Sequence, residues 1–206
     1  MGFPDGKFVA IGCFADAYFA KFNEAAETVD REKLQLASNI LTNVYREGGM
    51  VYSCGNGGSA AIANHLVCDH SKLVRTDTEL LSRIYSLSTT VEIITAIGND
   101  LSYDEVFVYQ LRFLAKPGDV LITISSSGDS ENIVRAAAWA KENGIQVISM
   151  TGFSGGRSAA IADVNLHVSA ENYGIIEDVH QSLMHLLAQY IRQAHMAEGL
   201  ILERKF

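Results

Sequence analysis

Apolar side chains along the chain switch between helical and extended spacing. Between residues 34 and 45 they recur at three and four positions, and the pattern stops at Gly48 and Gly49, which predicts a helix with a glycine stop. Residues 14–28 are also helix-prone. We therefore expect residues 1–47 to form an N-terminal helical arm that packs on the main domain.

Short apolar runs alternate with helical patterns through residues 48–206. Predicted strands cover residues 50–54, 84–87, 120–124, 147–150 and 164–168. Predicted helices cover residues 59–71, 90–97, 103–115, 130–143 and about 175–196. This alternation indicates an α/β fold, in which a central, mainly parallel sheet lies between two layers of helices.

Length, hydropathy and charge exclude several classes of protein. No stretch approaches the roughly 18 apolar residues of a membrane span. Residues 1–12 lack the basic start and long apolar run of a secretory signal, so a cytoplasmic location is expected. The net charge of −8 argues against a nucleic-acid-binding surface, which needs clustered Lys and Arg. An anionic substrate must then be held by amides and hydroxyls.

A glycine-rich loop follows the first predicted strand. Residues 54–59 read CGNGGS and open directly into a predicted helix. Glycines let the backbone approach a ligand closely, and the amino end of a helix offers unpaired N–H groups that favour an anion. The alternative is a tight turn that serves only to reverse the chain.

A serine cluster follows the third predicted strand. Residues 125–130 read SSSGDS and again precede a helix, so their hydroxyls can donate to phosphate oxygens without adding positive charge. The alternative is that Ser127, Asp129 or Ser130 only caps the helix. Because one residue suffices for a cap, the cluster favours anion binding. Neither loop matches a dinucleotide or P-loop motif, so no nucleotide cofactor is predicted.

Two predicted helices carry polar side chains suited to moving protons. His65 and Asp69 are four positions apart, and Glu177, Gln181 and His185 follow one another at steps of four. Imidazole and carboxylate are the usual pair for general acid–base catalysis. The alternative is a core histidine bonded to a carbonyl and a solvated surface acid.

Four sequence blocks, in this order, resemble the sugar isomerase (SIS) domain of the phosphoheptose isomerases. They are SCGNGGS (53–59), IGND (97–100), ISSSGDSENI (124–133) and TGFSGG (151–156) followed by Ala162-Asp163. The resemblance covers roughly residues 12–196. It implies a flavodoxin-like three-layer fold for residues 48–206 and two serine loops that bind a sugar phosphate. It also implies a homotetramer in which the arm of residues 1–47 packs on neighbouring subunits and the active sites lie between subunits.

The resemblance also implies roles for single residues. Expected sugar-phosphate ligands are Asn56, Gly57, Ser59, Asp100, Ser125, Ser126, Ser127 and Ser130. His185 is the expected acid–base residue, Asp69 lies where the family carries its catalytic glutamate, and Glu177 lies where it commonly has glutamine. Some members bind zinc through four equivalent side chains, so one zinc ion per subunit could be held by His65, Asp69, Glu177 and His185.

Several substitutions depart from the family pattern. Asp69 is one methylene shorter than glutamate, and a shift of about 1 Å can cost on the order of a hundredfold in rate. Either the substrate sits differently, or Glu177 acts as the base in place of Asp69. Residues 172–176 lack the usual arginine and acidic residue, and Leu73 replaces an expected arginine. The identity of the sugar is therefore open.

The leading hypothesis is an aldose–ketose isomerase that converts sedoheptulose 7-phosphate to D-glycero-D-manno-heptose 7-phosphate through an enediol. Asp69 or Glu177 would move the carbon-bound proton, and His185 would serve the oxygens. One alternative is an isomerase of another phosphorylated sugar. Another is a non-catalytic SIS module, either a sugar-phosphate sensor or an adaptor that binds the initiator protein DnaA.

Overall fold

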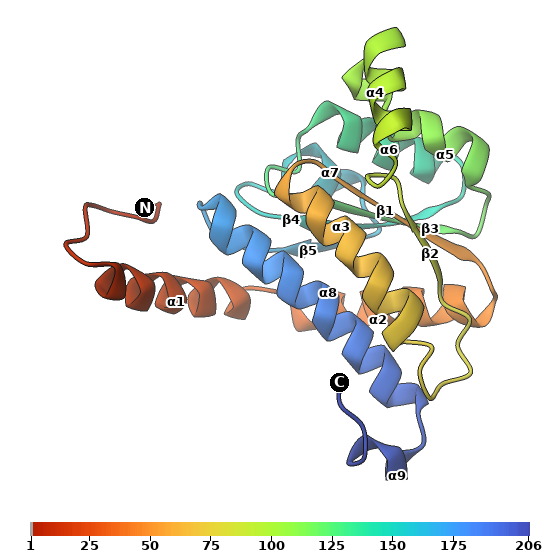
Figure 1. The fold of residues 1–206 in the computed structure, drawn as a ribbon. Coiled ribbons are helices and arrows are strands. Elements are labelled where there is room, and N and C mark those ends of the chain that lie inside the picture. The colour runs from red at the N-terminus through yellow and green to blue at the C-terminus, as the bar shows by residue number, and fades with distance from the viewer. Residues whose placement is uncertain (1) are drawn as a thin grey trace.

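A five-stranded sheet lies at the centre of the computed structural model, which describes residues 2–206 (Figure 1). Its strands are β1 (Met50–Gly55), β2 (Arg83–Ser86), β3 (Val120–Ser125), β4 (Gln146–Thr151) and β5 (Val164–His167). Neighbouring strands all pair in parallel, in the order β2-β1-β3-β4-β5. The predicted strands are confirmed, each to within one residue at either end.

Side chains of the central strands point alternately to two hydrophobic cores. Ile122 and Ile124 of β3 belong to the core on one face of the sheet, and Leu121, the residue before Ile122, belongs to the core on the other. All six residues of β3 are buried. Such continuous burial is typical of a parallel strand that is covered by helices on both faces.

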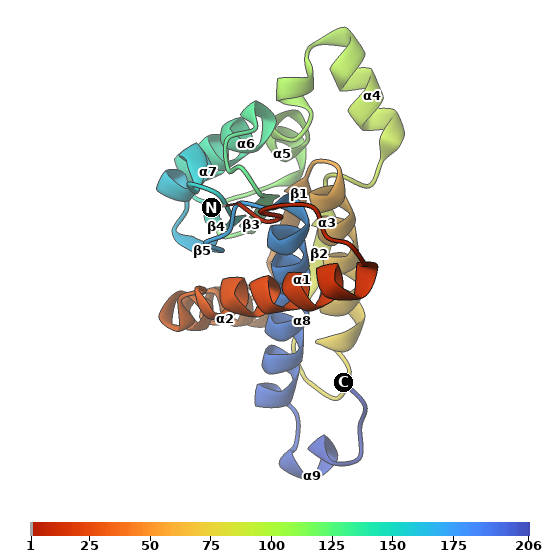
Figure 2. The same cartoon turned by 90° about the vertical axis from the view of Figure 1, so that its left-hand side faces the viewer.

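Helices cover both faces of the sheet, so the predicted three-layer α/β/α fold is confirmed (Figures 1 and 2). One layer contains α2 (Arg31–Arg46), α3 (Gly58–Cys68) and α8 (Tyr173–His195). The other contains α5 (Val108–Leu114), α6 (Glu131–Glu142) and α7 (Gly156–Ile161). The helix α4 (Val91–Asp100) projects from this second layer (Figure 2).

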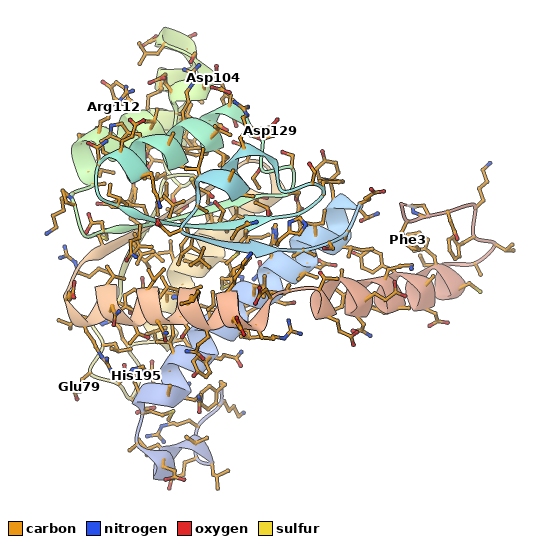
Figure 3. All side chains as sticks on the ribbon, turned by 180° about the vertical axis from the view of Figure 1, so that it is seen from behind. Phe3, Glu79, Asp104, Arg112, Asp129 and His195 are labelled. Atoms are coloured by element: carbon orange, nitrogen blue, oxygen red, sulfur yellow. The ribbon has the colours of Figure 1, made fainter. Side chains whose placement is uncertain are left out.

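The first helix, α1 (Ile11–Glu27), extends beyond the body of the molecule, and Phe3 lies beside it (Figures 1 and 3). Tyr18 of α1 packs within an aromatic cluster with Phe3, and its hydroxyl donates to Asp178 of α8 at 2.6 Å. The helix α2 of the predicted arm differs, because its apolar face is buried against the sheet. Of the predicted arm, α1 and residues 2–10 stand out from the domain.

The helices differ from the sequence-based expectation at three places. The helix expected over residues 59–71 changes at Asp69 into a π-helical turn, η1 (Asp69–Leu73). The one expected over residues 103–115 is split into a 3-10 turn, η2 (Tyr103–Glu105), and α5. The short helices α7 and α9 (Glu198–Ile201) lie outside every predicted range. Helices of one or two turns depend on tertiary packing, which periodicity does not record.

The C-terminal segment folds back onto α8 at a buried arginine. Arg192, whose side chain is 2% exposed, donates to the Thr76 carbonyl at 3.1 Å and to the Lys205 carbonyl at 2.9 Å. It also pairs with Asp77 at 3.1 Å and lies over the ring of Phe206. These contacts join the end of α8 to the segment that follows η1. None of the helices described has both the length and the apolar character needed to cross a membrane.

Candidate functional site

The two loops singled out by the sequence lie side by side at the carboxyl ends of β1 and β3. These strands are neighbours in the sheet, although β2 intervenes between them in the sequence. In an open parallel sheet, ligands bind where the strand order reverses, which for this order lies between β1 and β3. The topology therefore brings the loop before α3 and the loop before α6 to one crevice.

The loop after β1 is shaped by glycine and tied down by amides. Gly57 adopts a φ of +54°, which side chains rarely tolerate, and begins α3 without a side-chain cap. The Asn56 and Asn132 amides exchange hydrogen bonds of 2.9 and 3.0 Å. Tyr103 of η2 adds a hydrogen bond of 2.8 Å to Asn56 Oδ1. The first loop is thus fixed to α6 and η2.

The serine loop leaves several hydroxyls available to a ligand. Ser125 Oγ accepts from the Gly128 N–H at 3.1 Å, and Ser127 Oγ accepts from the Asp129 N–H at 3.3 Å. Ser130 begins α6 but makes no side-chain cap bond. The Ser126 hydroxyl is buried and has no hydrogen-bond partner within residues 2–206. Buried polar atoms normally have a partner, so the Ser126 hydroxyl is available to donate to a ligand.

Both loops line one small pocket, of about 150 Å³. Pockets for drug-sized ligands span roughly 300–1,000 Å³, so this one suits a group the size of a phosphoryl group. Its wall is formed by Asn56, Ser59, Ile124, Ser125, Ser126, Ser127, Ser130, Tyr173 and Glu177. Two helix amino ends and a cluster of hydroxyls therefore meet without any basic side chain in the wall.

A second glycine turn supports the serine loop from behind. The Gly152 N–H donates to the Ser126 carbonyl and the Ser158 N–H to the Gly128 carbonyl, both at 2.9 Å. Gly128 has a φ of +64°, and a Cβ at this position would overlap the Gly155 carbonyl. Arg157 pairs with Asp129 and holds the pKa of that carboxyl below its usual range. The serine loop is therefore held in place by contacts within the chain itself.

Beside this pocket, α3 and α8 bring two histidines and an aspartate together. His185 Nδ1 lies 2.6 Å from Asp69 Oδ2, and His65 Nε2 lies 3.5 Å from Asp69 Oδ1. The imidazole rings are 4.9 Å apart between centroids, at 83° to one another. Gln181, one turn before His185, lies 2.9 Å from a nitrogen of each ring. The side chain of Asp69 is 16% exposed and that of His185 37%, so a ligand can reach them.

The same two helices carry both halves of the site. α3 begins at the phosphate-sized pocket with Ser59 and carries His65 near its end, and Asp69 follows as the first residue of η1. α8 carries Glu177 at the pocket and His185 at the imidazole pair. Contact between α3 and α8 therefore fixes the pocket relative to the acid–base groups.

Glu177 lies in the pocket and apart from the histidine cluster. Its carboxylate packs on the first turn of α3 so closely that a Cβ on Gly58 would overlap it. Burial, together with the charge of Asp178, raises the pKa of Glu177 above its ordinary value. A carboxylate that retains its proton to higher pH opposes an incoming anion less than a fully ionised one does.

Three of the four predicted metal ligands form a cluster. One potential ligand atom from each of His65, Asp69 and His185 lies within 4.8 Å of the other two. Two imidazoles and a carboxylate are an acceptable donor set for zinc. Glu177 falls outside this cluster, because it lies eight positions before His185 on α8, or about 12 Å along the helix. The expected four-ligand set is therefore not brought together.

Asp100 is the other predicted residue that the structure places elsewhere. It ends α4 and lines a separate hollow with Ile93, Leu101 and Tyr109. The cause is the course of α4, which projects away from the sheet (Figure 2). The block IGND (97–100) therefore occurs in the expected order along the chain, but α4 carries Asp100 away from the pocket.

Four residues of the site were given no role from the sequence. Gln181 was visible only as a member of a polar stripe, and its contact with both imidazoles depends on how α3 packs against α8. Tyr173 enters the pocket wall from the start of α8. Asn132 and Tyr103 hold Asn56. These contacts span up to 116 positions, so no local pattern could have revealed them.

Comparison with known proteins gives consistent results. A family model described as the SIS domain matches residues 17–152. A probable phosphoheptose isomerase of Thermoplasma volcanium is 36% identical over 174 residues, which cover 84% of this chain and 88% of that protein. A phosphoheptose isomerase of Mycobacterium tuberculosis is 38% identical over 171 residues, which cover 82% and 87%.

A solved structure is equally similar. The phosphoheptose isomerase from Neisseria gonorrhoeae superposes with a TM-score of 0.81 at 34% identity, over 88% of this chain and 98% of that one. The two proteins therefore share their fold over nearly the whole of both chains.

Proposed function

Because the chain belongs to the SIS-domain family and, within it, to the phosphoheptose isomerases, we propose that it isomerises sedoheptulose 7-phosphate to D-glycero-D-manno-heptose 7-phosphate. The observation that carries this proposal is the position of the Asp69–His185 pair beside the serine-lined pocket. A sugar phosphate needs a site for its anion and a pair of groups for its protons, and both are present on α3 and α8.

The phosphoryl group binds in the pocket between the two loops. Ser59, Ser126 and Ser130 offer hydroxyl donors, and the amino ends of α3 and α6 offer backbone N–H groups. Hydrogen bonds to a charged acceptor are worth about 1.5–3 kcal/mol each, so a few of them suffice to hold a dianion without lysine or arginine. The support behind the serine loop means that little rearrangement is required.

Asp69 takes the proton from the carbon next to the carbonyl and later returns it to the former carbonyl carbon. The intermediate is an enediol, in which one proton also moves between the two oxygens. His185 lies in contact with Asp69 at 2.6 Å and serves those oxygens as acid and base. Glu177 is the less suitable base, because it lies at the phosphate end of the site.

His65, Asp69 and His185 would hold one divalent cation, such as zinc, per subunit. Such an ion, when bound, would polarise the carbonyl of the sugar. With or without a cation, the packing of α3 against α8 must hold these three side chains together.

We further propose a homotetramer that works in the cytoplasm. α1 supports this, because it projects from the domain with the side chains of Ile11 and Phe19 largely exposed. Exposed apolar positions on a protruding helix favour burial against another subunit. Sedimentation measured for the full chain and for a variant with Ile11 and Phe19 changed to Ser tests this part of the proposal.

Deuterium exchange tests the enzymatic proposal directly. The full-length protein is incubated with sedoheptulose 7-phosphate in deuterated water, and label is expected at the carbon next to the carbonyl. His185→Ala should abolish the exchange and leave binding of the sugar phosphate nearly unchanged, since the serine loops are separate. Exchange with a different ketose phosphate would reassign the substrate. Binding without exchange by the wild type would instead show a sensor.

A further inference from the structure

A chain of hydrogen bonds connects the buried His180 of α8 to the serine loop. The side chain of His180 is fully buried, and its Nε2 lies 3.2 Å from the carbonyl oxygen of Thr151, the last residue of β4. We infer that His180 is a positioning residue that holds the serine loop in the orientation needed to bind the phosphoryl group. The inference rests on the proposed function, because it concerns how the same pocket holds its ligand.

The imidazole of His180 is the donor in this contact. A carbonyl oxygen only accepts, so Nε2 carries the proton of the neutral ring and Nδ1 does not. Burial lowers the pKa of His180 to about 4, so the ring is neutral near pH 7. The Thr151 carbonyl also accepts from the N–H of Val168, just beyond β5, at 2.8 Å. Two donors on different elements therefore fix the direction of this carbonyl.

The peptide unit that follows Thr151 transmits this direction to the serine loop. In a planar trans peptide the C=O and the N–H point in opposite directions, and the N–H of this unit belongs to Gly152. That N–H donates to the Ser126 carbonyl at 2.9 Å. A hydrogen bond to the C=O of a peptide also polarises its N–H and strengthens the bond that the N–H donates. One rigid unit therefore links His180 to Ser126.

The next peptide unit belongs to the phosphate-sized pocket. It joins the Ser126 C=O to the Ser127 N–H, so this N–H points away from Gly152. Ser126 and Ser127 both line the pocket, and the buried Ser126 hydroxyl has no partner within residues 2–206. Donors on the ligand side of the loop are thus oriented from behind, through two peptide units that begin at His180.

Packing alone does not account for a histidine at this position. Ile176 already separates α8 from the turn after β4, because a Cβ on Gly152 would overlap its side chain. The Thr151 carbonyl already has a partner in Val168. Nδ1 of His180 has none within the part of the chain described, and an unpartnered buried nitrogen is costly. An apolar side chain would avoid that cost, so the Nε2–H has a role beyond filling space.

Two substitutions of similar size separate the N–H of His180 from its packing. In His180→Gln, the amide places a donor where Nε2 lies, whereas His180→Met has a similar length and no donor. Ser182→Ala is the control on α8, because its hydroxyl bonds only to the Asp178 carbonyl among the contacts described. Sulfate binding to each full-length protein is measured by calorimetry at pH 7, and melting temperatures are recorded alongside.

Sulfate should bind about three- to tenfold more weakly to His180→Met, which is the usual worth of one hydrogen bond. The affinities of His180→Gln and Ser182→Ala should stay within about twofold of the wild type, because neither loses the donor. His180→Met should melt no lower than the wild type, since it removes an unpartnered polar atom. Unweakened binding by His180→Met overturns the inference. Equal weakening in the Gln and Met variants also overturns it, because the shape of the ring would then be the cause.

Two NMR measurements on the wild type do not depend on how any variant folds. Long-range ¹⁵N–¹H correlations should show a proton on Nε2 of His180. Added sulfate should shift the Ser127 amide signal, because this N–H faces the ligand side of the loop. A bare Nε2, or a Ser127 amide that does not respond to sulfate, contradicts the relay.

Kinetics distinguishes this inference from the proposed function. In His180→Met, KM for sedoheptulose 7-phosphate should rise about three- to tenfold with kcat nearly unchanged, because Asp69 and His185 lie outside the phosphate pocket. A fall in kcat with KM unchanged would overturn the role of His180. If the variants rank as expected with sulfate but the wild type isomerises no sugar, the proposed function fails and the role of His180 stands.

Discussion

His185 Nδ1 and Asp69 Oδ2 lie 2.6 Å apart, although 116 positions separate the two residues in the sequence. The contact joins the middle of α8 to the junction of α3 and η1. An aspartate can therefore reach the imidazole in spite of its short side chain, because the two helices pack against one another at this point.

Asp69→Asn should remove the base and preserve the shape of the site. Asparagine still offers an oxygen to Nδ1 of His185, so the ring keeps its orientation, but it cannot take a proton from carbon. We expect kcat to fall by roughly 10²–10⁴-fold, the usual range for a general base, with KM within a few-fold. Steady-state kinetics with sedoheptulose 7-phosphate measures both parameters.

Glu177→Gln is the matched comparison for this variant. It should retain most of kcat, because Glu177 lies in the phosphate pocket. A nearly inactive Glu177→Gln together with an active Asp69→Asn would transfer the role of base to Glu177.

Ser126→Ala separates a ligand-binding role from a structural one. The buried Ser126 hydroxyl has no partner within the described chain. Its removal should therefore leave the stability of the fold unchanged or slightly higher. Binding of the sugar phosphate should nevertheless weaken about tenfold or more, since a donor to a charged oxygen is lost. Calorimetric titration and urea unfolding are compared, with Ser182→Ala as control. Unaltered affinity would remove Ser126 from the phosphate site.

Glu177 should make anion binding depend on pH. Burial raises its pKa, so the carboxyl is neutral at low pH and becomes charged as the pH rises through that raised value. Sulfate, which does not titrate in this range, should bind more weakly above that pH, by roughly tenfold, because like charges a few ångströms apart cost on the order of 1–3 kcal/mol. Glu177→Gln should abolish this step in a titration from pH 4 to 8. If sulfate affinity still falls with rising pH in Glu177→Gln, another titrating group is responsible.

Arg192 should matter for stability and hardly at all for chemistry. Its buried guanidinium holds two carbonyls, Asp77 and the ring of Phe206. Arg192→Met leaves the Thr76 and Lys205 carbonyls without this donor, while Asp77 keeps its pair with Arg204, and it should cost about 1–3 kcal/mol in unfolding free energy. Arg204, which shares Asp77 but is 42% exposed, is the control, and its alanine variant should melt close to the wild type. Equal melting temperatures for both variants would contradict this account.

The sheet could be predicted closely, because its strands are short, mainly apolar runs between turn residues. β3, for instance, is buried along its whole length, and its hydrophobic run needs no tertiary information to be recognised. The helices were less certain where packing decides the outcome. Val106 and Phe107 enter the core between η2 and α5, and this interrupts a segment whose periodicity predicts one helix.

The site could be predicted only in part, for a similar reason. Residues within one loop, such as Ser125 and Ser126, remain together whatever the rest of the chain does, and the structure finds them in one pocket. Glu177 and Asp100 depend on the course of α8 and α4. The first lies with the phosphate-sized pocket instead of the imidazoles, and the second lies outside the pocket altogether.

The path of α3 limits which sugars can react. Ser59 and His65 belong to one helix and are six positions apart, which is about 9 Å at a rise of ~1.5 Å per residue. A molecule whose carbonyl is only one or two carbons from its ester cannot occupy both ends at once. Longer sugars can occupy both ends, so the fixed spacing along α3 selects substrates by the number of carbons between the carbonyl and the phosphate ester. Accepting a shorter sugar would require moving a group by a helical turn, which no adjustment of a loop can achieve.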